Sequence, residues 1–143
     1  MEAGIKLRAT RLRRHNLLVR ALAEEFAEAG AVLYEDPFDI LAILRTRAFL
    51  VEVKTLNGSP DDERDRVRDA LSQLLYYESF VTQPLSGETP IRKVACFESE
   101  VSAAHGKWLN DRDIAVIWKN EDGTFSGDDL AGDFLGRHLK KLR

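Results

Sequence analysis

The chain has 143 residues, 44% of them hydrophobic, which is enough for one globular domain with an ordinary core. Its formal net charge of −3 excludes a protein that coats nucleic acid through bulk positive charge, because such binding needs many phosphate contacts. The single cysteine, Cys96, excludes a disulfide framework, and no apolar run approaches the roughly 20 residues that span a bilayer. We therefore expect one cytoplasmic domain over residues 1–143, without a membrane partner.

The first predicted element is an amphipathic helix over about residues 7–29. Leu18, Leu22 and Phe26 recur at helical spacing, and Gly30 gives the helix a natural end. Three short apolar runs then predict strands, and a tight turn at residues 45–47 joins the second strand to the third. These three strands are expected at residues 31–34, 39–44 and 48–53.

The second half of the chain alternates helices with strands. A long helix is predicted over about residues 61–81, and Asp61 or Asp62 can cap its start. The remaining segments predict strands at 91–97 and 114–118 and helices at 101–110 and 129–139. The order α-β-β-β-α-β-α-β-α predicts the mixed α/β class, with a central mixed sheet flanked by helices.

Three charged residues converge at one end of the predicted hairpin. Because side chains alternate along a strand, Glu52 and Lys54 point to the same face. If the hairpin turns about Thr46, antiparallel pairing sets Asp39 opposite Val53 and diagonal to Glu52. Two carboxylates and one ammonium group are therefore expected close together.

This convergence costs free energy, because neighbouring carboxylates repel each other and an ammonium group beside apolar strands loses hydration. A divalent cation relieves the conflict. Mg²⁺ or Mn²⁺ prefers oxygen ligands, which Asp39, Glu52 and the backbone carbonyl of Val53 can supply. Lys54 can orient a water molecule or stabilise the transition state, so the pattern indicates phosphodiester hydrolysis. A cross-strand salt bridge at the end of a sheet is the alternative interpretation.

This part of the chain resembles the PD-(D/E)XK nuclease superfamily, which includes restriction endonucleases, RecB-type nucleases and Holliday-junction resolvases. The resemblance spans about residues 14–77 and extends to the following strand. It implies a restriction-endonuclease-like three-layer core, and it assigns Asp39, Glu52 and Lys54 to metal binding and activation of water. The sequence Pro37-Phe38-Asp39 departs from a literal Pro-Asp pair, at a proline that varies widely in such proteins.

A second element of the resemblance lies at residues 73–77, which read QLLYY. They are similar to the Gln-x-x-x-Tyr motif that some family members carry on the helix after the lysine. Helical spacing places Gln73 and Tyr77 on the same edge of the helix as Arg66, beside its core face. Gln73 can donate to a phosphate or steady Lys54, and Tyr77 can stack on a base or hold the backbone. An ordinary amphipathic boundary is the alternative.

The first helix offers a third carboxylate, because family members often direct one from this helix toward the metal. Among Glu24, Glu25 and Glu28, Glu25 lies nearest the border of the apolar stripe. We therefore expect Glu25 to be a further metal ligand. His15 falls within that stripe, where a lone histidine is more often a hydrogen-bonded structural residue than a catalytic one.

The sequence thus predicts a Mg²⁺- or Mn²⁺-dependent nuclease that hydrolyses phosphodiester bonds, with DNA as the expected partner and restriction, defence or repair as the settings that the resemblance implies. The arginines cluster at residues 8–14 and 64–68, which would allow local contact with nucleic acid; solvated helix faces are the alternative interpretation of these clusters. The alternative is a non-catalytic nucleic-acid-binding or protein-assembly module on a nuclease fold. A homodimer would let a small nuclease reach two strands, although no residue identifies an interface.

Overall fold

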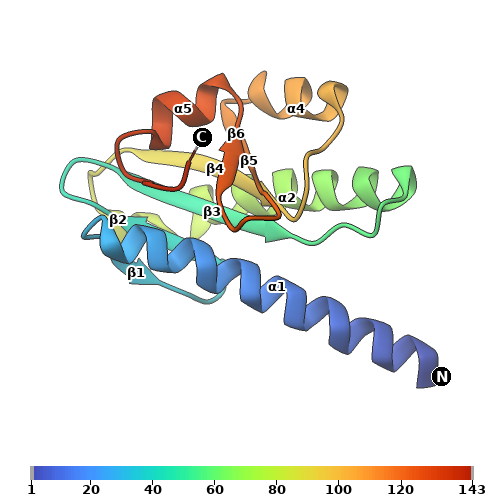
Figure 1. Cartoon of the computed structure of the whole chain (residues 1–143). Helices are drawn as coiled ribbons and strands as arrows, with labels where there is room; N and C mark the ends of the chain where they lie inside the picture. Colours follow the sequence, from blue (N-terminus) through green and yellow to red (C-terminus); the bar gives the residue numbers. More distant parts are fainter. Residues whose placement is uncertain (1, 143) are drawn as a thin grey trace.

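A computed structural model describes residues 2–142 and shows a twisted sheet with helices on both faces (Figure 1). The predicted mixed α/β class and the three-layer core are confirmed. The helices are α1 (Glu2–Glu28), α2 (Pro60–Phe80), α3 (Gln83–Ser86), α4 (Ala103–Asn110) and α5 (Asp129–Leu135). The strands are β1 (Val32–Tyr34), β2 (Ile40–Ile43), β3 (Ala48–Lys54), β4 (Ile91–Phe97), β5 (Ile114–Lys119) and β6 (Phe125–Gly127).

The six strands lie in the sheet in chain order, from β1 to β6. The pairs β1–β2, β2–β3 and β5–β6 are antiparallel, whereas β3–β4 and β4–β5 are parallel. Each parallel pair is joined through a helix, because a parallel connection must return the chain to the starting edge of the sheet. The central strand β3 is therefore buried on both faces until it reaches Lys54.

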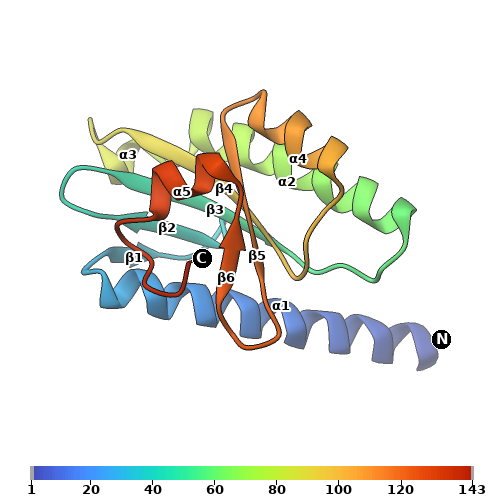
Figure 2. The same ribbon diagram turned by 45° about the horizontal axis from the view of Figure 1, so that its top comes forward.

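Two apolar clusters fill the space between the sheet and its helices. One joins Leu22 and Phe26 of α1 and Leu135 of α5 to one face of the sheet. The other joins Leu74 of α2 and Leu109 of α4 to the opposite face. Figure 2 shows α1 beneath β1 and β2, and α5 beside β5 and β6. Residues of β3 alternate between the two clusters, as the predicted period of two requires.

Two elements were not expected from the sequence, and one cap differs from the prediction. The helix α3 is only four residues long, and the short strand β6 is part of the sheet because it pairs with β5. The cap of α2 is Ser59, whose hydroxyl accepts a hydrogen bond from the backbone N–H of Asp62 at 3.2 Å. Asp61 and Asp62 lie inside the first turn, where their charge favours the positive end of the helix dipole.

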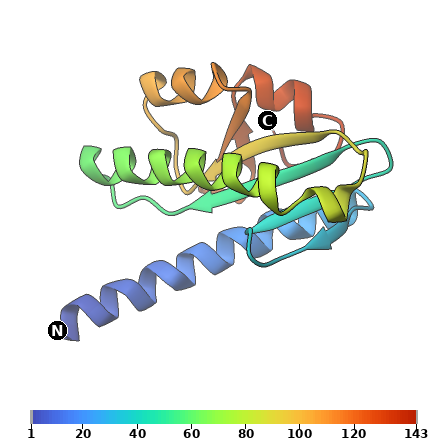
Figure 3. The same ribbon diagram turned by 180° about the vertical axis from the view of Figure 1, so that it is seen from behind.

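The first helix is longer than predicted, since it begins at Glu2 rather than near residue 7. Its N-terminal half extends past the end of β3, and α2 extends past the same end on the other face of the sheet (Figures 1 and 3). The two helices thus form walls beside the end of β3. Among the residues that the structure describes, no helix is long and apolar enough to cross a membrane.

Candidate active site

The three predicted charged residues meet at the end of β3. The hairpin pairs Ile40 with Val51, and continuing this register sets Asp39 in line with Glu52 rather than with Val53. The register differs by one residue from the prediction because the turn closes between Leu44 and Arg47, whose backbone N–H and C=O groups lie 2.8 Å apart. The side chains nevertheless converge.

Backbone and side-chain hydrogen bonds hold Asp39 against Glu52. The backbone N–H of Val53 donates to Oδ2 of Asp39 at 2.8 Å, and the backbone N–H of Asp39 donates to Oε1 of Glu52 at 3.3 Å. The N–H and C=O of one residue in an extended strand point to the same side, so the carbonyl of Val53 also faces Asp39. The neighbouring carbonyl of Lys54 faces the other way and accepts from Glu98.

A chain of polar contacts runs from β3 to α2. Nζ of Lys54 donates to Oε1 of Gln73, and it lies 3.8 Å from Oε2 of Glu52. Tyr77 lies one helical turn beyond Gln73, on the same edge of α2. The ring of Tyr77 packs edge-on against Phe38, at a centroid distance of 6.1 Å. Gln73 therefore fixes the lysine, while Tyr77 lies one turn behind Gln73 and is not among the residues that line the hollow.

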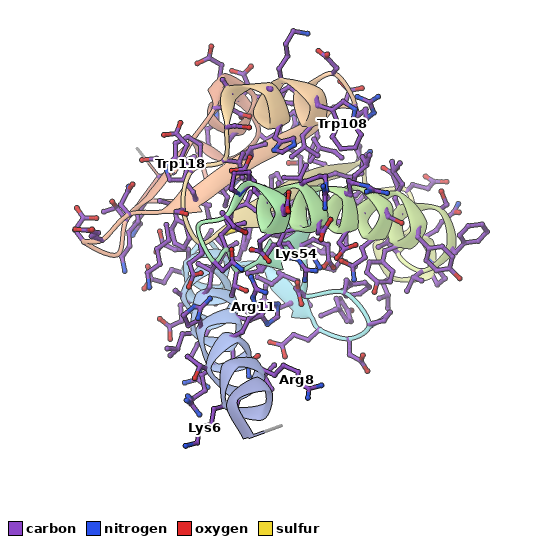
Figure 4. The ribbon with its side chains drawn as sticks, turned by 90° about the vertical axis from the view of Figure 1, so that its right-hand side faces the viewer. Lys6, Arg8, Arg11, Lys54, Trp108 and Trp118 are labelled. Carbon is purple, nitrogen blue, oxygen red and sulfur yellow. The ribbon has the colours of Figure 1, made fainter. Side chains whose placement is uncertain are left out.

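These groups line an open hollow of about 390 Å³ between α1 and α2. Asp39, Glu52, Val53 and Lys54 line it from the sheet side. The remaining lining residues come from the two helices and from the segments beside the hairpin: Arg8, Arg11, Leu12, His15, Pro37, Thr55, Arg66 and Gln73. In Figure 4, Lys54 lies between α1 and α2, and Arg11 lies between Lys54 and α1. The site is thus two carboxylates and a lysine between walls that carry arginines.

Arg11 fastens the two walls together. Its guanidinium group donates to both carboxylate oxygens of Asp62 on α2, at 2.9 and 2.8 Å, and to the hydroxyl of Thr55 at 2.7 Å. Both contacts to Asp62 come from Nη2, while Nε serves Thr55, and a hydrogen bond between two charged groups is stronger than one between neutral groups. Arg11 therefore holds α1 at a fixed distance from α2, and its charge is already matched.

His15 supplies the contact from α1 to the carboxylates. Its Nε2 lies 3.2 Å from Oδ1 of Asp39, and this hydrogen bond raises the pKa of His15 although burial acts to lower it. Burial also acts to raise the pKa of Asp39, but the bonds from His15 and from the backbone of Val53 outweigh it, so the pKa lies below its usual range. Asp39 is therefore held as a carboxylate.

Glu52 has the opposite behaviour. Its side chain is 3% exposed, and burial together with the charge of Asp39 raises its pKa from 4.5 to about 8, although Lys54 partly opposes the shift. The fold therefore favours the protonated form of Glu52 at neutral pH. A cation bound between the two carboxylates would reverse this preference, because an adjacent positive charge favours the ionised form.

The structure does not bring Glu25 to this hollow, so the expectation that it is a metal ligand is wrong. Its carboxylate is buried and accepts a hydrogen bond from the backbone N–H of Lys141 at 2.8 Å. Glu25 follows His15 by ten residues, which is about 15 Å along a helix. Helical spacing correctly placed Glu25 beside the core, but it did not say which level of the sheet the residue would reach.

From the sequence, His15 was interpreted as a structural residue, and Arg8 and Arg11 were noted only as part of a cluster of arginines. The structure places all three at the hollow. The signal for all three was their spacing, because positions 8, 11 and 15 share one helix face. That face lines the hollow. The partners Asp39 and Asp62 lie far away in the chain, so only the fold identifies them.

The donor set suits a hard divalent cation. Oxygens of Asp39 and Glu52 and the carbonyl of Val53 face one another, and Mg²⁺ commonly takes one or two carboxylates and completes its shell with water and phosphate oxygens. Within residues 2–142, no group of three or more His, Cys, Asp or Glu side chains is arranged to hold a metal ion.

Comparison with known proteins finds likeness only at the level of structure. No family model matches the sequence, and no curated protein matches it. An XisH family protein from Nostoc punctiforme PCC 73102 superposes with a TM-score of 0.52 and 12% identity, covering 76% of this chain and 94% of that one. An fdxN element excision controlling factor protein from Anabaena variabilis gives a TM-score of 0.50 and 13% identity, covering 77% and 95%. These two structures share the fold of this chain.

Proposed function

We propose that the chain is a Mg²⁺- or Mn²⁺-dependent nuclease that hydrolyses phosphodiester bonds in DNA. The observation that carries this proposal is the convergence of Asp39, Glu52 and Lys54 in an open hollow whose walls carry arginines. The fold leaves the conflict between the two carboxylates uncompensated, since the pKa of Glu52 is raised to about 8. A divalent cation compensates it, and a phosphate group matches the surrounding cationic side chains.

The residues of the site have distinct roles in this proposal. Asp39 and Glu52, with the carbonyl of Val53, hold the metal ion. When bound, the ion would act as a Lewis acid that lowers the pKa of water and neutralises charge on the phosphate. Lys54 has three N–H donors, and one of them is used by Gln73. The other two can bind phosphate oxygens and stabilise the negative charge that develops on them.

Gln73 and Tyr77 act through Lys54. The amide oxygen of Gln73 holds the ammonium group in one orientation. Tyr77, one helical turn further on, would support Gln73. Positioning of this kind matters because small displacements of a catalytic group reduce the rate strongly. The name of one structural neighbour, an fdxN element excision controlling factor, is consistent with a role in nucleic-acid processing.

The test is a cleavage panel over linear, circular, single-stranded and branched DNA and RNA, with Mg²⁺ or Mn²⁺ and with EDTA. We expect metal-dependent cleavage of DNA that EDTA abolishes. Lys54→Ala and Asp39→Ala should each reduce the rate by about 10³-fold, because they remove electrostatic stabilisation of the transition state and a metal ligand. Circular dichroism checks that both variants are folded.

Lys93→Ala is the matched control. Lys93 is also a half-buried strand lysine beside a glutamate, with Nζ 2.8 Å from Glu78, but it does not line the hollow. Its activity should stay near that of the parent. Equal cleavage by the parent and Lys54→Ala would contradict the proposal. If no substrate is cleaved and calorimetry detects no Mg²⁺ or Mn²⁺ binding, the chain is a non-catalytic binding or assembly module instead.

A further inference from the structure

Three arginines line the hollow, Arg8 and Arg11 from α1 and Arg66 from α2. Arg11 is paired with Asp62 and Thr55, and Arg14 pairs with Glu98 at 2.7 Å. These two residues hold the fold together. Arg8 and Arg66 face each other across the hollow in the sense that one lies on each wall, Arg8 on α1 and Arg66 on α2.

Arg8 lies on the hollow-facing side of α1. It precedes Arg11 by three residues and His15 by seven, which places all three on one face of the helix. Lys6 and Arg13 are exposed and lie on the opposite face, seven residues apart. In Figure 4, Arg8 and Arg11 lie on the side of α1 nearest to Lys54, whereas Lys6 points away. Only one face of this basic helix therefore serves the site.

Arg66 occupies the facing wall. It lies on α2 seven residues before Gln73, or two helical turns along the edge that lines the hollow. One guanidinium nitrogen lies 3.2 Å from Asp69, while Nε is buried and has no hydrogen-bond partner within the structure. A buried donor without a partner costs free energy. The side chain as a whole is 32% exposed, so a phosphate in the hollow can reach the outer part of the guanidinium group. Arginine is also well suited to phosphate because its planar fork binds two oxygens at once.

We propose that Arg8 and Arg66 form a phosphate clamp, in which each arginine binds a DNA phosphate flanking the one held at Lys54. This inference rests on the proposed nuclease function and names the substrate class of that site as a polynucleotide with at least three consecutive phosphates. The three cationic groups lie on two walls and between them, so three consecutive phosphates would give each group a partner. The hollow is open, which lets a continuous strand pass through it.

The charge distribution of the chain favours such a strand. Six of the 21 Lys and Arg residues, and none of the 24 Asp and Glu residues, lie between positions 3 and 23. The rest of the chain consequently has a net charge of −9. A polyanion is therefore attracted to the N-terminal part of α1, which borders the site, more than to the rest of the chain.

The test measures binding of a fluorescein-labelled 20-base-pair duplex by anisotropy in EDTA, where the proposed nuclease cannot cleave. The variants are Arg8→Ala/Arg66→Ala and the control Lys6→Ala/Arg13→Ala, which removes the same charge from the opposite face of α1. We expect the clamp variant to lose about 10- to 100-fold in affinity and about 1.8 in the slope of log K against log salt, at 0.9 per phosphate contact. The control variant should lose less than about threefold, because it removes only long-range attraction.

A dinucleotide competitor provides a second readout. It has one phosphodiester, so its affinity should be the same for the parent and for the clamp variant. Thermal melting shows whether each variant is folded. The exposed ion pairs that the substitutions remove contribute little to stability. The clamp is wrong if its variant binds the duplex as the parent does, or if the control variant loses as much affinity.

Failure of the clamp and failure of the nuclease are distinguishable. If the parent cleaves DNA in a Lys54-dependent manner while the clamp variant binds and cleaves normally, the clamp is wrong and the nuclease function stands. If the parent never cleaves but the clamp variant binds duplex 10-fold more weakly than the control variant, the clamp stands as the contact of a binding module.

Discussion

Two pairs of carboxylates lie near the end of β3, and their surroundings differ. The site carboxylates are Asp39 and Glu52; the capping carboxylates are Asp62 and Glu63, in the first turn of α2. Asp62 accepts from Arg11 and from the backbone of Asn57. Burial acts to raise the pKa of Asp62, but these contacts lower it. The same balance holds at Glu63, where His105 and Ser102 supply the donors and the pKa is lowered.

The site carboxylates have no such compensation at Glu52. Asp39 has His15 and a backbone N–H, whereas Glu52 is buried and faces the charge of Asp39. Lys54 and the backbone N–H of Asp39 oppose these effects on the pKa of Glu52 only in part. Acidic residues at the start of a helix stabilise the fold, since the helix dipole favours them. A buried carboxylate with a raised pKa lowers stability and is typical of a functional site. The environment of each carboxylate, rather than its residue type, separates structure from function here.

The sharpest way to break this comparison is to neutralise one carboxylate of each pair and measure the free energy of unfolding in EDTA. Glu52→Gln should stabilise the protein by about 2 kcal/mol at pH 8.5, because it removes a buried charge that the fold disfavours. Glu63→Gln should destabilise it by about 1 kcal/mol, because it weakens charge-assisted hydrogen bonds. Urea unfolding curves for both variants and the parent provide the values.

The dependence on pH has a definite sign for Glu52. Between pH 4.5 and about 8 the unfolded chain ionises this group while the folded chain keeps it protonated. The unfolded state then binds fewer protons, so the stability of the parent falls as pH rises through this window. Glu52→Gln lacks this loss, and its advantage should vanish below pH 4.5. An equal effect of Glu52→Gln at pH 4 and pH 8.5 would show that Glu52 is not a strained carboxylate.

A smaller effect is expected at His15, which connects the site carboxylates to α1. His15→Ala should reduce metal affinity or cleavage by about 10-fold, because residues that orient metal-binding carboxylates typically contribute that much. His15→Gln retains a side-chain N–H donor and should recover part of the loss. Metal titration by calorimetry separates a change in affinity from a change in rate. Wild-type metal affinity and cleavage in His15→Ala would limit this histidine to a packing role.

The sequence predicted the local features of the fold well. The strand at residues 91–97 has the predicted limits, and the long helix agrees within one residue at each end. The period of two along β3 was sufficient to place Glu52 and Lys54 on one face. Elements that depend on distant partners were missed, since the three-residue strand β6 exists only through its pairing with β5 and a bridge between Phe125 and Leu142.

The same limit applies to the candidate site. Asp39, Glu52 and Lys54 lie on neighbouring strands of one hairpin, so alternation and pairing brought them together without knowledge of the fold. The prediction for Glu25 was wrong because helical periodicity shows which face of the helix a residue is on, but not which part of the sheet that residue lies against. His15 lies at the right level, but its contact with Asp39 depends on how α1 crosses the sheet.

The smallest effect is expected at His105, on the capping side of the comparison. His105→Ala should lower the free energy of unfolding by about 1 kcal/mol at pH 7, because Glu63 loses its side-chain partner, and cleavage should change by less than about twofold. The contribution of Glu63 is present above its unfolded pKa of 4.5 and is lost as pH falls through its lowered folded pKa. The stabilities of the parent and of His105→Ala should therefore converge in strong acid. A loss of cleavage as large as that of His15→Ala, in a folded protein, would mean that the capping carboxylates also serve the reaction and that the distinction between the two pairs is wrong.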